Sequence, residues 1–331
     1  MVMSITIKFF LKDGTLIKPT IFGANDELVA NREITGNLFE NDMALTVAQM
    51  LQATSPQQSR FRRKVIADPK LRWKGAVVPY YFSDPDKAWQ RRIKNTLNYY
   101  ENETCVRFVE RSDATDFIYF LKGKGCFSAV GKLGGSQPLS VGLGCESLGV
   151  ISHEIGHALG FVHEQERPER DSYVRINLQY AIPGTEGNFD KRPLGTTVDL
   201  GVPYDLGSVM HYASTVDENH FIGANSLKAF TFESLRHTVD PIDTKYRSTV
   251  GNRVAPSFTD IKQINRAYCA DSCRNTINIC ENEGYPDPND CSRCKCPQGL
   301  GGATCTDLEY SSKLSRHFEV LSSFLIKATA N

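Results

Sequence analysis

The chain has 331 residues, more than one ordinary hydrophobic core requires, so we expect two or three folded parts. Its 38 lysines and arginines balance its 38 aspartates and glutamates and form no basic stretch, which argues against a nucleic-acid partner. No apolar run reaches the roughly 18 residues that a bilayer span requires, so no membrane span is expected.

The ten cysteines all follow residue 104, and this number indicates an oxidising compartment in which they form disulfides. In a cytosolic protein several of them would instead be zinc ligands. Cys291-x-x-Cys294 could be half of such a site, but the chain has no second matching pair. The sequon Asn102-Glu103-Thr104, a glycosylation acceptor at Asn102, also favours a secreted protein. Residues 1–20 lack the features of a typical leader, so we expect an atypical leader or an incomplete start.

Residues 1–63 are polar and mixed, without cysteine or a long hydrophobic period, and are not expected to form a compact domain. They end in Arg60-Phe61-Arg62-Arg63, an R-x-R-R run of the kind that proprotein convertases cleave. Similar clusters elsewhere are often only solvated charge.

From residue 64 onward the pattern predicts an α+β domain. Residues 77–82, 105–109 and 117–121 have the composition and alternation of strands. Ser83-Asp84-Pro85 predicts the start of a helix, with proline in the first turn and Ser or Asp as the cap, and helical spacing continues to about residue 101.

Residues 148–161 predict the helix that carries the chemistry. Positions 153–157 read HEIGH and fit H-E-x-x-H, in which two imidazoles four residues apart share one helix face. Gly160 allows the backbone to leave the helix, because glycine takes positive φ at no steric cost. The turn brings His163 back toward the same point.

These three histidines offer neutral nitrogen ligands and leave a fourth position open, which is the arrangement of a catalytic zinc site. The sequence therefore predicts one Zn²⁺ held by His153, His157 and His163. Glu154 is predicted to lie beside the ion without binding it and to act as the general base.

Downstream, Ser208-Val209-Met210-His211-Tyr212 supplies the Met-turn that accompanies this histidine pattern in metzincins. Met210 is expected to form an apolar floor beneath the imidazoles, and His211 is expected to be structural. Residues 258–268 predict the last helix of the domain, with Thr259 as its cap.

The histidine run continues as Glu164-Gln165-Glu166-Arg167-Pro168-Glu169-Arg170-Asp171. Together these residues resemble the astacin family of zinc metalloendopeptidases, whose motif is H-E-x-x-H-x-x-G-F-x-H-E-x-x-R-x-D-R-D. Only Glu169 departs from it, standing where the family has aspartate, and the charge is kept. The resemblance covers roughly residues 39–305. It implies an α+β metzincin domain, with a twisted mixed sheet and helices over a loop-rich lower half, and a secreted endopeptidase made as a zymogen.

Residues 38–43 resemble the family's pro-segment motif F-x-G-D. The resemblance makes Asp42 the ligand that occupies the zinc in the zymogen. Asn41 replaces the motif's glycine, but asparagine also tolerates left-handed backbone. The alternative for this stretch is a solvated acidic loop.

The resemblance also places the mature amino terminus at Lys64, after activation cleavage between Arg63 and Lys64. In the family, the new terminal amine meets the glutamate after the third histidine, here Glu164. The alternative for Glu164 is an exposed acid at a helix end.

Tyr212 matches the tyrosine that, in the family, is a fifth zinc ligand at rest and donates to the oxyanion once substrate binds. Its alternative is a core aromatic. Residues 134–137, Gly-Gly-Ser-Gln, resemble the family's edge segment, to which an extended peptide can add.

The family's pairing implies two disulfides in the catalytic domain. The last six cysteines, with Gly299 and Gly302 near the last of them, resemble an EGF-like module, which is too small to fold without bridges. Six cysteines allow fifteen pairings. The implied disulfides are Cys105–Cys269 and Cys126–Cys145, then Cys273–Cys291, Cys280–Cys294 and Cys296–Cys305.

The predicted organisation is a pro-segment at 1–63, a metalloprotease domain at 64–269, an EGF-like module at 270–306 and a tail at 307–331. Nematode members of the family commonly carry this arrangement. We expect protein or peptide substrates and an extracellular partner for the EGF-like module. Two other functions stay open: a proteolytically silent extracellular binding protein, and a fold in which zinc is only structural and has four protein ligands.

Overall fold

The computed structural model describes residues 9–10, 16–17, 30–31, 38–53, 65–111, 113–181, 185–192, 197–214 and 237–309. Most of the expected leader, the expected cleavage site Arg63-Lys64 and the tail beyond residue 309 lie outside these ranges. None of the helices in this part of the chain has the length and apolar character needed to cross a bilayer.

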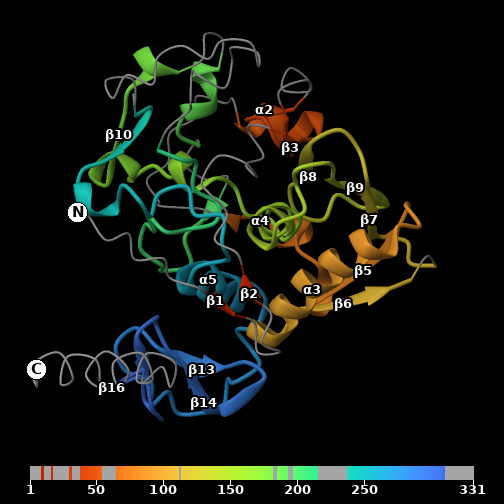
Figure 1. Ribbon diagram of the computed structural model, residues 1–331. Helices are drawn as coiled ribbons and strands as arrows, with labels where there is room; N and C mark the ends of the chain where they lie inside the picture. The colour runs from red at the N-terminus through yellow and green to blue at the C-terminus, as the bar shows by residue number, and fades with distance from the viewer. Residues whose placement is uncertain are drawn as a thin grey trace, which may run out of the picture.

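A six-stranded mixed sheet forms one layer of the catalytic domain (Figure 1). The order across the sheet is β3-β8-β9-β7-β5-β6, and only the β8–β9 pair is antiparallel. The strands are β3 (Met43–Ala44), β5 (Val77–Phe82), β6 (Arg107–Glu110), β7 (Phe117–Leu121), β8 (Cys126–Ala129) and β9 (Ser136–Val141).

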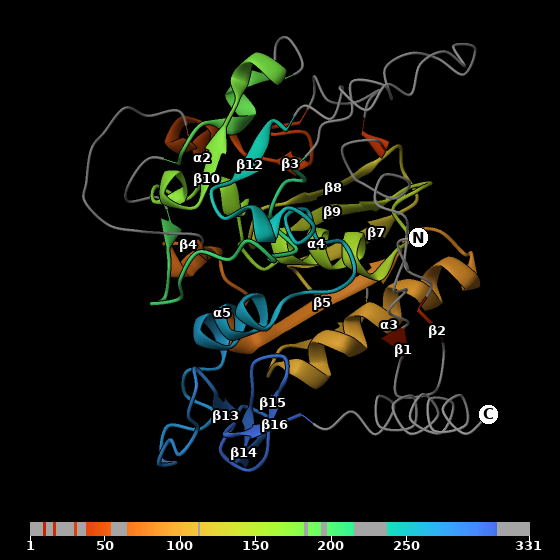
Figure 2. The same ribbon diagram turned by 60° about the vertical axis from the view of Figure 1, so that its left-hand side comes forward.

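Two helices, α3 (Lys87–Glu103) and α4 (Leu148–Ala158), contact each other and the sheet (Figures 1 and 2). The large apolar residues of α3 recur at helical spacing, so they share one face of the helix, and this face is buried. Ile93, in the middle of the helix, is fully buried. The main core of the domain lies between these helices and the sheet.

The expected cap of α3 was wrong. The helix begins after Asp86, whose carboxylate accepts hydrogen bonds from the backbone N–H groups of Ala88 and Trp89. Asp84 accepts instead from the N–H of Asp86 and so stabilises a turn before the helix. The hydroxyl of Ser83 donates to the carbonyl of Phe120 at 2.9 Å, so neither Ser83 nor Asp84 caps α3.

The last helix, α5 (Phe258–Tyr268), has the predicted bounds but another cap. Ser257 accepts from the N–H of Asp260, and the Asp260 carboxylate accepts from the N–H of Ser257, a reciprocal capping box. Thr259 lies inside the first turn, so the expectation that it caps the helix was wrong.

The half of the domain after α4 consists mainly of short elements, as the resemblance implied, and has a small core of its own. Elsewhere, α2 (Val47–Ala53) follows β3, and the pair β1 (Phe9–Phe10) and β2 (Leu16–Ile17) lies near the start of the chain. The short strands are β4 (Val65–Ile66), β10 (Val174–Ile176), β11 (Thr197–Val198) and β12 (Val239–Pro241). The 3₁₀ helices are η2 (Pro69–Leu71), η3 (Lys74–Ala76), η4 (Glu164–Glu166), η5 (Arg170–Ser172), η6 (Leu178–Tyr180), η7 (Glu186–Phe189) and η9 (Thr244–Tyr246).

The expected edge segment was wrong. Gly134 and Gly135 have φ of 88° and 70° and form a turn, and Ser136 begins β9, which lies between β8 and β7. Without β3, the edges of the sheet are β8 and, at the other end, β6. The segment of residues 38–53, here called the N-terminal segment, supplies β3, which pairs with β8 at Met43–Ser128 and Ala44–Ala129.

The C-terminal module, residues 273–305, is held together by three disulfides. It contains three short strands, and a fourth follows directly after it; the four strands form two antiparallel pairs. All five disulfides have the pairing that the resemblance implied. The strands are β13 (Tyr285–Asp287), β14 (Asp290–Lys295), β15 (Leu300–Gly301) and β16 (Asp307–Leu308).

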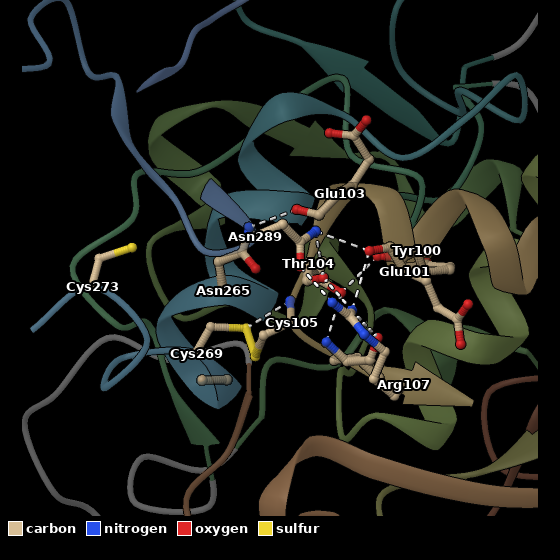
Figure 3. Close-up of a disulfide and its surroundings, with 12 residues drawn as sticks. Tyr100, Glu101, Glu103, Thr104, Cys105, Arg107, Asn265, Cys269, Cys273 and Asn289 are labelled. Carbon is tan, nitrogen blue, oxygen red and sulfur yellow. Dashed lines mark hydrogen bonds between the residues drawn. A yellow bond between two sulfur atoms is a disulfide. The ribbon is translucent and has the colours of Figure 1, made fainter. Parts of the chain in front are cut away.

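The C-terminal module contacts the end of α3 beside the Cys105–Cys269 disulfide (Figure 3). The side-chain amide of Asn289 donates to the backbone carbonyls of Glu101 and Thr104, both at 3.0 Å. Lys295 forms an ion pair of 2.7 Å with Glu103. The two bonds from Asn289 satisfy carbonyls that the last turn of a helix leaves without an intrahelical partner.

Candidate active site

The helix α4 places His153 and His157 on one face, four residues apart. The helix ends at Ala158, not at Phe161 as predicted, because Gly160 takes φ 97° and turns the chain. The turn places the ring of His163 beside the rings of His153 and His157, as the sequence predicted.

The ring nitrogens Nε2 of the three histidines converge on the carboxylate of Asp42. Asp42 Oδ2 lies 3.2 Å from His153 Nε2 and 3.1 Å from His163 Nε2, and Oδ1 lies 3.5 Å from His157 Nε2. Nε2 of His153 and Nε2 of His157 are 3.1 Å apart. All four side chains are fully buried.

The outward-facing ring nitrogens have oxygen partners. Nδ1 of His153 lies 2.8 Å from the carbonyl of Val209, and Nδ1 of His157 lies 2.8 Å from the carbonyl of Phe161. A carbonyl only accepts, so each Nδ1 carries the ring proton and each Nε2 presents a lone pair. Burial lowers the pKa of His157 to about 4, which keeps that ring neutral.

This donor set fits a zinc ion. Lone pairs that face each other and a carboxylate at these distances repel, and a divalent cation between them removes the repulsion. Ligand atoms about 2.0–2.1 Å from a tetrahedral zinc lie roughly 3.3–3.4 Å apart, close to the separations found here. Oδ1 of Asp42 is buried without a hydrogen-bond donor, as a metal-facing oxygen would be.

Asp42 reaches the cluster on a tight turn of the N-terminal segment. Glu40 and Asn41 take φ of 49° and 73°, and Phe39 and Met43 pair across the turn. Burial alone would raise the pKa of the Asp42 carboxyl, but the neighbouring His163 ring outweighs burial and holds this pKa well below its ordinary value. The alternative of a solvated acidic loop is therefore wrong.

Glu154 is fully buried on α4, directly after the first histidine. It does not belong to the four residues whose ligand atoms lie within 4.8 Å of one another. Its absence from this group agrees with the prediction that Glu154 does not bind the metal, and its role as general base stays a prediction.

The Met-turn lies under the imidazoles. The sulfur of Met210 lies 2.6 Å from the point that a Cβ at position 156 would occupy, so a larger residue there on α4 would displace the methionine side chain. His211 is structural, because its Nε2 lies 2.6 Å from the hydroxyl of Tyr204. The ring of Tyr212 packs 4.6 Å from that of His163, and its hydroxyl donates to the carbonyl of Glu40 at 2.6 Å.

Glu164 is fully buried, so the alternative of an exposed acid is wrong. Its carboxylate accepts from the guanidinium of Arg167 at 3.0 Å and from the N–H of Asp205 at 2.8 Å. Arg167 also donates to Glu169, the residue that departs from the family motif, at 2.6 Å. The role of Glu164 as an anchor for the terminal amine stays a prediction, since Lys64 lies outside the described residues.

Sequence reasoning missed a buried cluster behind His163. Nδ1 of His163 lies 2.9 Å from the Glu40 carboxylate, and Glu166 accepts from the N–H of His163 at 3.1 Å and from Arg192 at 2.9 Å. The Arg192 guanidinium also stacks 4.9 Å from the Phe39 ring. Glu40 stood at a variable position of its motif and Arg192 in no motif, so only the fold identifies them.

Glu40 and Glu166 are two neighbouring buried carboxyl groups. Burial and the charge of Glu166 raise the pKa of Glu40 well above its ordinary value. Burial also acts to raise the pKa of Glu166. The charge of Arg192 and a hydrogen bond from Glu40 outweigh burial, so the pKa of Glu166 is lowered. A proton shared by the two carboxyl groups therefore favours Glu40 over Glu166.

Asn102, the predicted glycosylation site, is exposed in the last turn of α3. Its modification stays a prediction.

The mixed sheet and the helix with its converging imidazoles define the catalytic domain of a metal-dependent peptidase. The family model of Astacin, a peptidase family, matches residues 65–269, and the chain belongs to this family.

Two curated relatives are nematode enzymes. The chain is 45% identical over 285 residues to "Zinc metalloproteinase nas-30" of Caenorhabditis elegans, covering 84% of this chain and 36% of the relative. It is 38% identical over 311 residues to "Zinc metalloproteinase nas-37" of the same organism, covering 92% of this chain and 39% of that relative. The chain thus spans less than half the length of these relatives.

Among solved structures, the chain resembles high choriolytic enzyme 1, a hatching enzyme zinc-protease from the medaka fish Oryzias latipes. The TM-score is 0.50 and the sequence identity is 37%, covering 60% of this chain and 92% of that one. The α+β astacin-type fold is thereby confirmed.

Proposed function

We propose that the chain is a secreted, zinc-dependent endopeptidase that is made as a latent zymogen and activated by cleavage between Arg63 and Lys64. The observation that carries the proposal is the carboxylate of Asp42 at the centre of the three imidazoles. This carboxylate comes from a segment that precedes the matched family domain. Five disulfides agree with an oxidising, extracellular compartment.

His153, His157 and His163 would hold the zinc, and their Nδ1 partners keep them in the tautomer that binds through Nε2. When bound, zinc polarises the attacking water and the scissile carbonyl. Glu154 accepts a proton from that water and returns it to the leaving amine. Tyr212 donates its hydroxyl to the developing oxyanion once Glu40 no longer accepts it.

The edge strand β8 would hold the substrate backbone. In the latent form β3 pairs with β8 at Ser128 and Ala129, and the N–H of Ser128 donates to the carbonyl of Asp42 at 3.0 Å. Departure of the N-terminal segment exposes this edge, and an extended peptide can then pair with it. Backbone pairing selects an unfolded segment of a protein more than a particular side chain.

The position of Val65 supports cleavage near Arg63-Lys64. Val65 is fully buried and pairs with Phe161, two residues before the third histidine. The N–H of Ile66 donates to the carbonyl of Gly160 at 2.9 Å. A terminus created at Lys64 would therefore begin beside the histidine loop, from which the amine would reach Glu164.

The C-terminal module would be an EGF-like domain, since its three disulfides have the EGF pairing order. Its free surface would contact an extracellular protein. Asn102 would carry a glycan.

The four groups around the metal position also admit a purely structural zinc, because four ligands close a site. The two functions differ after cleavage. A structural zinc needs Asp42 permanently, whereas a latent enzyme gains activity when Asp42 leaves. The silent binding protein, in turn, predicts no hydrolysis in either form.

The test compares the uncut full chain with the same chain cleaved by a dibasic-specific convertase on a peptide library. We expect hydrolysis only after cleavage, its loss with a zinc chelator and its return with added zinc. The control Glu154→Gln should retain zinc and lose about 10²–10⁴-fold in rate. A cleaved chain that binds zinc and hydrolyses no peptide would exclude the endopeptidase.

A further inference from the structure

The three imidazoles differ in where their outer partners come from. Val209 and Phe161, which orient His153 and His157, belong to the catalytic domain. The partner of His163 is the side chain of Glu40, 123 residues earlier in the chain. One of the three outer partners therefore lies on the N-terminal segment.

Glu40 is held in this position from several sides. Its backbone has φ 49°, and its carbonyl accepts from the hydroxyl of Tyr212. Its carboxyl contacts Glu166, which in turn is paired with Arg192. The side chain is 3% exposed. A carboxyl fixed this firmly restrains the ring that it contacts.

We propose that Glu40 is a positioning residue for the metal site of the latent chain, fixing the tautomer and orientation of His163 from behind while Asp42 covers the site from the front. The N-terminal segment thus completes the metal site as well as blocking it. When this segment leaves, the third ligand loses its outer partner and the chain holds zinc less tightly. This inference rests on the proposed function in taking the N-terminal segment as a removable latency segment.

The test measures zinc affinity of the uncut full chain by competition with a chromogenic chelator, so it needs no peptidase activity. Glu40→Ala should weaken zinc binding about tenfold or more, within the 10–100-fold cost typical of losing an outer partner. Glu40→Gln should retain most of the affinity, because its amide offers the same acceptor to His163 and a donor to Glu166. The matched control is Gln49→Ala, which removes a hydrogen bond of 2.8 Å from the N-terminal segment to Val130 and touches no histidine.

A double variant separates a direct effect on His163 from looser docking of Asp42. If Glu40 acts through His163, adding Glu40→Ala to Asp42→Ala weakens zinc binding further, by a factor similar to that in the parent. Equal affinities of Asp42→Ala and the double variant would overturn the proposal. So would an equal loss in Gln49→Ala and Glu40→Ala.

A spectroscopic readout covers the case in which Glu40→Ala does not fold. In zinc-loaded chain labelled with ¹⁵N-histidine, Glu40→Gln should shift the Nδ1–H signal of His163 and leave those of His153 and His157 in place. Three unchanged signals would overturn the proposal, whatever the peptidase assay gives.

Discussion

Arg167 and Glu164 form a buried ion pair directly after the third histidine, with guanidinium Nη1 3.0 Å from carboxylate Oε1 and both side chains at most 1% exposed. The same guanidinium donates to the carbonyls of Val202 and Pro203. The pair thereby joins the loop after His163 to the chain that leads into the Met-turn.

Replacing Arg167 by alanine should destabilise the full chain by about 3–5 kcal/mol, because it leaves the charge of Glu164 buried without its partner. The measurement is urea unfolding followed by fluorescence. Arg167→Lys should also destabilise the chain, though less, since a lysine keeps the charge but not the planar fork. Unchanged unfolding midpoints in both variants would contradict this role.

Tyr212→Phe should lower kcat of the cleaved enzyme by about 10²–10³, the usual cost of removing one oxyanion donor. Zinc content should not change, because the phenylalanine ring keeps the packing against His163. Tyr268→Phe is the control: it removes another largely buried hydroxyl, which donates to Leu159 away from the cluster. Equal kcat values in the two variants would exclude Tyr212 as the oxyanion donor.

Asp42→Ala should give the uncut chain measurable peptidase activity, because the carboxylate that fills the fourth ligand position is gone. The same substitution should leave the cleaved enzyme unchanged, since residue 42 is then absent. The measurement is the rate of peptide hydrolysis before and after convertase treatment. An uncut variant as silent as the parent would place latency elsewhere in the N-terminal segment.

Asn289→Ala should loosen the contact between the C-terminal module and α3. We expect a loss of about 0.5–1.5 kcal/mol and faster amide hydrogen exchange in the last turn of α3. Asn282→Ala serves as control, since Asn282 donates to the carbonyl of Cys305 within the module. Exchange in α3 that rises equally in both variants would argue against a specific contact.

The histidine site could be predicted because its geometry is mostly local. Spacing on one helix fixes His153 and His157, and one glycine determines how His163 returns. Glu40 could not be assigned a role, because nothing in the spacing of residues indicates a contact that spans 123 positions. The spacing of residues was informative only within one continuous stretch, and Asp42, more than 100 positions from the histidines, was identified through the family resemblance.

The two incorrect caps and the incorrect edge have a common physical origin. Asp84, Asp86 and Ser83 offer similar capping groups, and three-dimensional packing decides between them. The glycines at 134 and 135 suit either a turn or an edge, and strand order depends on pairing between distant segments. Composition alone cannot distinguish such alternatives.

The contacts of Asn289 and Lys295 with the end of α3 mean that the C-terminal module is not tethered by a flexible linker. A protein captured by the module would therefore be held at a constant distance and angle from the β8 edge. If the module binds a substrate protein, as proposed, this fixed geometry would favour cleavage at one distance from the bound site and would spare bonds that lie closer or farther along the substrate.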